Sequence, residues 1–273
     1  MVRSLWSAAS GMIAQQTNLD VIANNLANVN STGYKAETAE FKSLLYQTMQ
    51  TETTTANGAN KPISAQVGLG VRNASVTSIF NQGSLLASES PTAMAIEGKG
   101  FFAVKDLDGS TKYTRNGNFN FSTGGGSTLI LSTSDGLPVL DSTGKEIKID
   151  STRYDVSKIS VDANGNLCYP DATNNAQSMG IKIGLYQFNN PSELEKVNDT
   201  MYNVSAASGA AKNEATDTSL TKSKVVQGYL EGSSVQVVDE MVNMIVAQRA
   251  YEMNSKAITT TDQMMEIANN LKR

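Results

Sequence analysis

Apolar side chains near the start of the chain recur every three or four residues, which is the spacing of one face of an α-helix. This face consists of Leu5, Ala9, Met12, Gln16, Leu19, Ala23 and Leu26. A second apolar row beside it consists of Trp6, Ile13, Ile22 and Val29. The pattern predicts a helix over residues 5–26. An Asn-rich turn follows, in which Gly33 is suited to a left-handed backbone conformation.

The polar positions of this predicted helix carry few charges. Arg3 and Asp20 are the charged residues among the first thirty, and most other polar positions are uncharged amides. Amides can be buried at hydrogen-bonded positions without the free-energy cost of burying ions. The pattern therefore favours a helix that is surrounded by protein on most sides. An intramolecular helix with an amide-rich surface is the alternative, whereas a membrane-surface helix would carry more Lys and Arg.

The region from Ser234 to Leu271 contains neither Gly nor Pro and predicts a second long helix. Ser233 and Gln236 have the spacing of a capping box at its start. One apolar stripe consists of Val237, Met241, Met244, Gln248, Tyr251, Ile258 and Met265, and further apolar surface of Val238, Val242, Ile245, Met264 and Leu271. Because one partner helix would cover one stripe, the additional surface predicts several neighbours. The alternative is that both stripes pack on the protein's own middle region.

Between the two predicted helices, short runs of strand-forming residues alternate with turn signals. Strands are expected at residues 101–104, 112–115, 128–131, 145–149, 159–161 and 181–188. Pairs such as Asn116-Gly117 and Asp135-Gly136 supply the turns between them. Turn spacings of roughly 8 to 20 residues favour an antiparallel barrel or sandwich over βαβ units.

The chain is therefore expected to have an α+β fold. Its N- and C-terminal helices would pair as a coiled-coil-like domain formed by residues 1–45 and 226–273. An extended polar segment at residues 46–70 would lead into an inserted antiparallel β-rich domain, barrel- or sandwich-like, at residues 71–204. A Ser-, Ala- and Thr-rich stretch at residues 205–225 would be a linker.

Composition removes most catalytic and metal chemistry. The 273-residue chain has no histidine and one cysteine, Cys168, which excludes His-based metal sites and Ser-His-Asp or Cys-His catalysis. Lys and Arg number 22 against 26 Asp and Glu, and the resulting net charge of -4 argues against a nucleic-acid partner. An enzyme built from this chain would have to rely on carboxylate, lysine or tyrosine chemistry.

The motifs that could bind a ligand are incomplete. Gly98-Lys99-Gly100 is too short for a dinucleotide fingerprint. The run that starts at Asp106 begins like a calcium loop, but Thr111 and Gly117 stand at the positions that need Gly and Glu. We therefore expect no catalytic residues, no cofactor site and no metal site.

The first residues do not contain the continuous apolar stretch of a signal peptide or a transmembrane helix. Ser7, Ser10 and Gln15 are among the residues that interrupt it. If the protein leaves the cytoplasm, we expect it to do so without a cleaved signal peptide.

Several motifs are similar to those of the rod and hook proteins of the bacterial flagellar basal body. The first is Leu19-Asp20-Val21-Ile22-Ala23-Asn24-Asn25-Leu26-Ala27-Asn28-Val29-Asn30, followed by Gly33-Tyr34-Lys35. Others are Val67-Gly68-Leu69-Gly70-Val71-Arg72, Gly98-Lys99-Gly100-Phe101-Phe102 and Tyr113-Thr114-Arg115-Asn116-Gly117. The C-terminal region resembles the family from Gln227-Gly228-Tyr229 to Thr261-Asp262-Gln263-Met264. Within these motifs, the residues taken as the family signature are Asn24, Asn25, Asn28 and Gly33.

The resemblance implies a non-enzymatic axial subunit that polymerises helically into a hollow drive shaft, which transmits torque from the motor to the hook and encloses an export channel. The subunit would pass through the flagellar type III export apparatus and lie outside the cytoplasmic membrane. Its partners would be copies of itself, proximal rod proteins, the hook protein or its junction, the export apparatus, and bushing rings where an outer membrane is present. No nucleic acid, cofactor or lipid bilayer is expected among them.

By the same resemblance, the two terminal helices would supply the packing interface. The residues expected there are Leu5, Met12, Leu19, Ile22, Leu26, Val242, Met244, Ile245, Tyr251, Ile258 and Met265. The segment from Thr51 to Gln66 would extend between subunits and stiffen the shaft.

Two alternatives remain open. Residues 44–48, the polar segment up to Gln66 and the chain length favour the distal part of the rod, and a proximal rod protein of the same family is the alternative. In a different class, the chain would be a cell-surface adhesin or a cell-wall-acting enzyme with a β-rich domain. Such an enzyme would bring carboxylates together in a pocket of the β-rich region.

Overall fold

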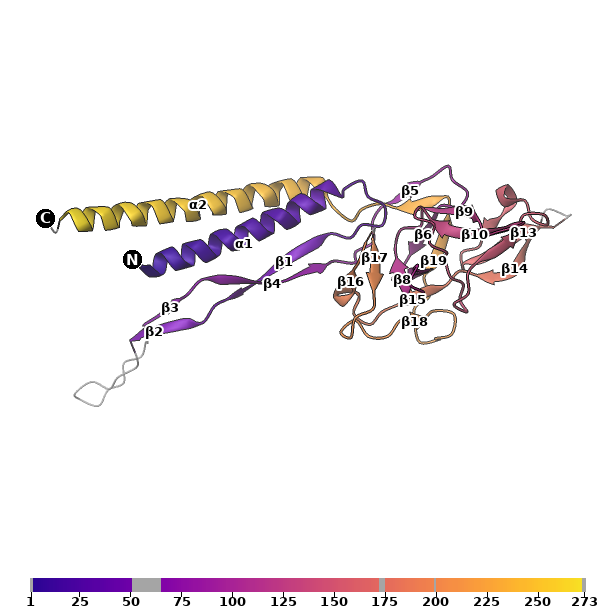
Figure 1. Ribbon diagram of the computed structural model, residues 1–273, viewed down its shortest axis with the longest axis horizontal. Coiled ribbons are helices and arrows are strands. Elements are labelled where there is room, and N and C mark those ends of the chain that lie inside the picture. The colour runs from indigo at the N-terminus through magenta and orange to yellow at the C-terminus, as the bar shows by residue number, and fades with distance from the viewer. Residues whose placement is uncertain (1, 51–64, 172–174, 199, 272–273) are drawn as a thin grey trace. The chain divides into compact units, whose positions relative to one another are not determined.

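The computed structural model describes residues 2–50, 65–171, 175–198 and 200–271 (Figure 1). A long helix lies near each end of the described chain and short β-strands fill the region between them, so the predicted α+β class is confirmed. The chain divides into two compact units. The helical unit comprises Met1–Ala27, Glu37–Thr77 and Gln236–Arg273, and the β-rich unit comprises Asn28–Ala36 and Ser78–Val235.

The helical unit contains α1 (Val2–Ala27) and α2 (Val237–Asn270), which run antiparallel and side by side (Figure 1). Close to one end of the pair, Asn25 Nδ2 donates a hydrogen bond to Glu240 Oε1 at 3.2 Å. Farther along, Gly11 of α1 faces Asn254 of α2. Both helices predicted from apolar periodicity are therefore present.

The second helix begins later than its sequence pattern predicts. Its N-cap is Gln236, which has extended backbone angles and makes no capping hydrogen bond through its side chain. Ser233 Oγ instead accepts a hydrogen bond from the N–H of Val235 at 3.3 Å, before the helix starts. The predicted capping box is therefore wrong, because Ser233 is used in the turn that precedes α2.

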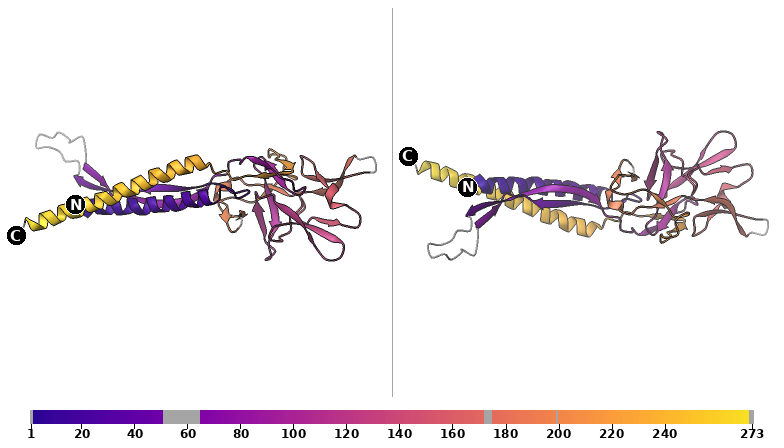
Figure 2. Two further views of the ribbon diagram at one scale, coloured as in Figure 1. Left: turned by 90° about the horizontal axis from the view of Figure 1, so that it is seen from above. Right: turned by 90° about the horizontal axis from the view of Figure 1, so that it is seen from below.

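Two pairs of strands complete the helical unit. They are β1 (Glu37–Ser43) with β4 (Val71–Ser78), and β2 (Tyr46–Gln50) with β3 (Ala65–Gly68). β1 contacts α1, and Figure 2 shows the β1–β4 pair following α1 in two further views. The described parts of the segment at residues 46–70, expected to be extended and polar, contain the antiparallel strand pair β2–β3. Residues 51–64, which include most of the segment expected to link subunits, lie outside the described residues.

The β-rich unit is built from several small antiparallel sheets. The six-stranded sheet has the order β16-β17-β8-β7-β15-β18, with strands Glu195–Lys196, Met201–Asn203, Thr111–Thr114, Phe101–Lys105, Leu185–Gln187 and Lys212–Asn213. Two three-stranded sheets have the orders β11-β10-β9 (Lys148–Asp150, Thr128–Thr133, Phe119–Thr123) and β12-β13-β14 (Ser160–Val161, Asn166–Pro170, Ala176–Lys182). Two pairs are β19 (Lys224–Gln227) with β6 (Met94–Glu97), and β20 (Tyr229–Glu231) with β5 (Leu85–Ala87).

Apolar side chains from different sheets form the core of the β-rich unit. The main cluster includes Met94, Ile96, Phe102, Phe119, Leu131, Val139, Ile147, Ile149, Leu167, Ile183 and Val225. A second cluster is aromatic, and in it Phe101 contacts Phe80 and Phe188 edge to face. Cys168 is a free cysteine and is buried in this unit.

Residues 205–225 were expected to be a linker, but they belong to the β-rich unit. β18 adds this stretch to the six-stranded sheet. The Glu214 carboxylate is buried and accepts hydrogen bonds from the N–H and Oγ of Ser223 and from Gln187 Nε2, each at 2.8 Å. The linker prediction is therefore wrong, because these polar residues find their hydrogen-bond partners inside the unit.

Candidate assembly surface and the contacts that support it

One side of α2 carries a row of exposed apolar side chains, here called the outer face of α2. It consists of Val238, Val242, Ile245, Val246, Met253, Ile267 and Leu271. Val242 is 54% exposed, Ile245 56% and Val246 62%. At about 100° per residue these positions fall on a single side of the helix. The exposed apolar side chains are densest from Val238 to Val246, and Arg249 and Lys256 follow on the same side. Clustered exposed apolar side chains are typical of a protein-binding site.

The opposite side of α2 faces α1 and is already occupied. Ala247 and Thr261 are buried there, and Asn254 lies against Gly11. The predicted interface residues on this side are Met244, Ile258 and Met265, all partly buried. The predicted interface residues of α2 therefore divide between the outer face and the side that faces α1. Val242 and Ile245 lie on the outer face. Tyr251, also a predicted interface residue, is 39% exposed.

The predicted interface residues of α1 lie mostly inside the helical unit. Ile22 is buried, and the partly buried ones are Leu5, Met12, Leu19 and Leu26. Trp6 and Ile13 are instead 69% and 67% exposed, and their spacing of two helical turns places them on one side. This outer face of α1 was missed as an interface by sequence reasoning, although the second apolar row contained both residues.

Asn25 joins three elements of the helical unit. Its Nδ2 donates to the backbone carbonyl of Glu37 at 2.8 Å and to Glu240 Oε1 at 3.2 Å, and its Oδ1 accepts from the N–H of Glu37 at 2.9 Å. A neutral amide supplies donors and an acceptor at once, so it can satisfy all three groups while only 1% exposed. Burial raises the pKa of the Glu240 carboxyl, Asn25 opposes the shift, and Asp239 adds to it.

The other residues predicted to form the family signature lie around the end of α1. Asn24 Nδ2 donates to Glu37 Oε2 at 3.2 Å, and Asn28 Oδ1 accepts from Ser31 Oγ at 3.1 Å in the following turn. Gly33 has φ +71°, and a Cβ there would stand 2.6 Å from the backbone nitrogen of Asn116. Gly33 is therefore required both by its left-handed conformation and by the close approach of another segment.

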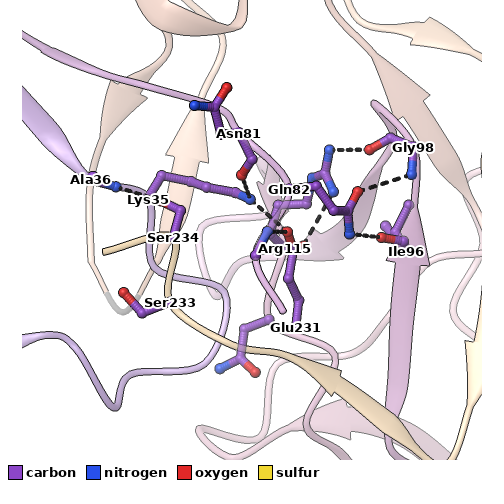
Figure 3. A network of polar contacts seen from close by, with 12 residues as sticks. Lys35, Ala36, Asn81, Gln82, Ile96, Gly98, Arg115, Glu231, Ser233 and Ser234 are labelled. Atoms are coloured by element: carbon purple, nitrogen blue, oxygen red, sulfur yellow. Dashed lines mark hydrogen bonds and ion pairs between the residues drawn. The ribbon is translucent and has the colours of Figure 1, made fainter. Parts of the chain in front are cut away.

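A buried ionic cluster lies in the β-rich unit and consists of Lys35, Glu231 and Arg115 (Figure 3). Glu231 Oε1 accepts from Lys35 Nζ at 2.6 Å and from the N–H of Gly83 at 2.9 Å. Glu231 Oε2 accepts from Arg115 Nη1 at 3.2 Å, and Arg115 Nη2 donates to the backbone carbonyl of Gly98 at 2.6 Å. The side chains of Lys35 and Glu231 are 0% exposed, so the hydrogen bonds replace water entirely at this carboxylate.

The charges of the cluster depend on one another. Burial lowers the pKa of Lys35, and the Glu231 carboxylate counteracts that shift. Burial also lowers the pKa of Arg115, and Glu231 again opposes the change. Removing the Glu231 charge would leave two buried cations together, which is the costly case for a buried ion cluster. Sequence reasoning missed this cluster, because nothing local connects Lys35 to a carboxylate far along the chain.

A polar cavity of about 580 Å³ also lies in the β-rich unit. Its lining includes Asn28, Asn30, Thr32, Asn116, Asp135 and Lys196. Among the lining residues that the structure describes, Asp135 is the one carboxylate, so the paired carboxylates of a glycosidase-type site are not assembled there. Within the described chain there is also no group of three or more metal-ligating side chains. Nor is any helix among the described residues long and apolar enough to span a membrane.

Comparison with known protein families accounts for both helices. The family described as "Flagella basal body rod protein" matches residues 5–35, which include most of α1 and Asn25. "Flagellar basal body rod FlgEFG protein C-terminal" matches residues 226–271 and contains the outer face of α2. "Flagellar hook protein FlgE/F/G D1 domain" matches residues 95–169 of the β-rich unit.

Full-length relatives agree with these matches. The chain is 41% identical over 275 residues to a flagellar basal-body rod protein FlgG from Borreliella burgdorferi, with both chains covered completely. It is 42% identical over 279 residues to the FlgG of Agrobacterium fabrum, covering 99% of this chain and 100% of the relative. The chain belongs to the flagellar basal-body rod protein family.

Other members of the rod protein family are similar over the same length. The FlgG of Bacillus subtilis is 39% identical over 280 residues, and a flagellar hook-basal body complex protein FlhP from the same organism is 30% identical over 278 residues. Each comparison covers the whole of both chains. The rod-family assignment therefore includes the β-rich unit as well as the two helices.

Proposed function

We propose that this protein is a structural, non-enzymatic subunit that polymerises into the distal rod of the flagellar basal body, as the FlgG name of its relatives suggests. The observation that carries the proposal is the outer face of α2. Its apolar side chains are exposed although the other side of α2 is already filled by α1. Burying them against a second copy would remove this apolar surface from water and stabilise the assembly.

The outer faces of α1 and α2 belong to different surfaces of one subunit. Trp6 and Ile13 form one, and the row that includes Val242 and Ile245 forms the other. A contact between two different surfaces of identical subunits is heterologous, and repeating it without closure produces a helical filament. We propose that the α1 outer face of one copy packs on the α2 outer face of the next.

Further features of the assembly follow from this proposal. The terminal helices would form a coiled-coil-like layer around a channel, and the β-rich unit, with its barrel- or sandwich-like closure, would form a separate domain. Neighbours at the ends of the filament would be proximal rod proteins and the hook protein or its junction. The subunit would reach its place outside the cytoplasmic membrane through the flagellar export apparatus and would turn inside bushing rings where an outer membrane exists.

The test is a charge placed on the outer face of α2. Ile245→Glu should abolish sedimentable polymers of the purified full chain and leave rods incomplete in basal bodies imaged from a complemented deletion strain. Gln248→Glu adds the same charge to α2 at another exposed position and serves as the matched control. Met244→Glu is less informative, because Met244 lies on the side that faces α1. Normal polymers and rods from Ile245→Glu would disprove the proposed interface.

A further inference from the structure

The ionic cluster of Lys35, Glu231 and Arg115 lies within the β-rich unit, and two of its residues are close in the sequence to points at which the chain continues into the helical unit. Three passages of the chain from one unit to the other follow Ala36, Thr77 and Val235. Lys35 comes just before the passage that follows Ala36, and Glu231 comes shortly before the passage that follows Val235. The segment from Asn81 to Gly83, which follows the passage after Thr77, contacts both side chains. Figure 3 shows the contact between Asn81 and Lys35.

The contacts of the cluster join each of these three segments to the other two. Lys35 Nζ donates to the backbone carbonyl of Asn81 at 2.6 Å and to Glu231 Oε1. The N–H of Gly83 donates to the same Glu231 oxygen, and the N–H of Gly33 donates to the Glu231 backbone carbonyl at 2.8 Å. Arg115 connects this group of contacts to β8 and to Gly98.

Stability alone does not account for the choice of charged residues here. A buried ion cluster loses about as much free energy on desolvation as it gains from attraction, and apolar side chains of similar volume are often equally stable. Apolar contacts are non-directional, whereas the Lys35 ammonium reaches one particular carbonyl and one carboxylate. A slip of one residue in any of the three segments would break these contacts, because each joins a particular atom of one segment to a particular atom of another.

The register of these segments matters for the helical unit. Glu37 follows Lys35 closely in the chain and is the residue whose backbone Asn25 holds through two hydrogen bonds. Ser234 Oγ accepts from the N–H of Ala36 at 2.9 Å shortly before α2 begins. The chain therefore enters both β1 and α2 directly from segments that Lys35 and Glu231 hold.

We propose that Lys35 is a positioning residue for assembly, which acts through Glu231 and the Asn81 carbonyl to fix the register of the three passing segments. It acts on assembly by holding the entry points of β1 and α2, more than on the stability of the β-rich unit. The inference rests on the proposed function, because its partner is a second copy of this chain.

The test compares two substitutions in the full chain. Lys35→Met leaves Arg115 paired with Glu231, so we expect a melting temperature within about 5 °C of the parent protein. The concentration needed for polymerisation should nevertheless rise by about tenfold or more. Amide hydrogen exchange should quicken at Gly33, Ala36 and Gly83. Glu231→Gln leaves two cations unpaired and should lower the melting temperature much further.

Lys105→Met is the matched control, because Lys105 is 44% exposed on the side chain and pairs with Glu146 elsewhere in the β-rich unit. It should change neither polymerisation nor exchange at the three segments. Unchanged polymerisation and exchange in Lys35→Met would overturn the inference, and so would a loss of folding as large as that of Glu231→Gln. If the parent protein itself fails to polymerise, the proposed function fails, and the exchange rates still decide whether Lys35 fixes the register.

Discussion

The side chain of Asn25 and the backbone of Glu37 form a closed pair of hydrogen bonds at 2.8 and 2.9 Å. The pair links the last turns of α1 to the first residue of β1, across the Asn-rich turn between them. Because Asn25 also donates to Glu240, one buried amide determines how three elements of the helical unit meet. This contact gives a structural reason for an Asn at position 25, one of the residues predicted from the sequence to form the family signature.

Asn25→Asp should destabilise the helical unit in a pH-dependent way. An ionised carboxylate cannot donate to the Glu37 carbonyl, and it would stand against the Glu240 carboxylate. We expect the free energy of unfolding to fall by about 3 kcal/mol at neutral pH. Both carboxyls would have raised pKa values in the folded state, so the lost stability should return as the pH falls below them.

Urea denaturation at neutral and at acid pH would measure this effect. Gln16→Glu places a carboxylate on the exposed side of α1 and is the control for added charge. An equal loss of stability at both pH values would contradict the role assigned to the Asn25 amide.

Replacing Gly11 by Ala should stabilise the protein less than replacing a glycine inside a helix usually does. An Ala in place of Gly inside a helix gains about 1 kcal/mol. At Gly11, however, the new Cβ would stand 2.8 Å from Asn254 Nδ2. We expect Gly11→Ala to leave stability within about 0.5 kcal/mol of the parent, and to gain about 1 kcal/mol in an Asn254→Ala background.

A double-mutant cycle of thermal or urea unfolding would measure that coupling. Gly11→Leu should separate the helices and cost about 3 kcal/mol. Additive effects of Gly11→Ala and Asn254→Ala would mean that the two residues do not constrain each other.

Trp6 should report on assembly directly. It is the only tryptophan of the sequence and is 69% exposed on the outer face of α1. If that face binds a second copy, Trp6 fluorescence should shift to shorter wavelength and become less accessible to iodide as polymers form. Trp6→Ala should raise the concentration needed for polymerisation by about tenfold or more, as loss of a buried aromatic anchor does. Fluorescence that is identical in monomer and polymer would place Trp6 outside the interface.

Tyr113 should make the β-rich unit sensitive to alkaline pH. Burial, followed by the neighbouring Tyr186, raises the pKa of Tyr113 from 10.0 to about 12. The folded state thus favours the protonated phenol, so the associated stability is present below pH 10.0 and is lost as the pH rises towards about 12. Denaturation across this range should show the decline, and Tyr113→Phe should weaken it. A decline unchanged by Tyr113→Phe would assign it to other groups.

Local sequence patterns were sufficient for the two helices and for some of the strands of the β-rich unit, such as β7 and β10, but not for the strands of the helical unit. Leu5, Met12 and Leu19 recur with the helical period, and Asp135-Gly136 marks a turn in which Gly136 has a φ of +81°. The turn predicted at Asn116-Gly117 is not formed, and neither residue is in a turn there. The predictions of the capping box and of the linker were wrong, because the residues concerned make other contacts in the folded chain. Ser233 has the spacing of a cap but is used in the preceding turn, and Glu214 makes an apparent linker part of a sheet.

By itself the sequence determined where apolar surface lies on each helix, since that depends only on spacing and the helical period. It also excluded histidine chemistry, since that depends on composition. The tertiary structure decided which apolar surface remains available: Ala247 and Asn254 meet α1, whereas Val242 and Ile245 stay exposed. The contact between Lys35 and Glu231 also depends on the tertiary structure alone. The two residues are far apart in the chain, so the packing of the intervening segments brings them together and no local preference does.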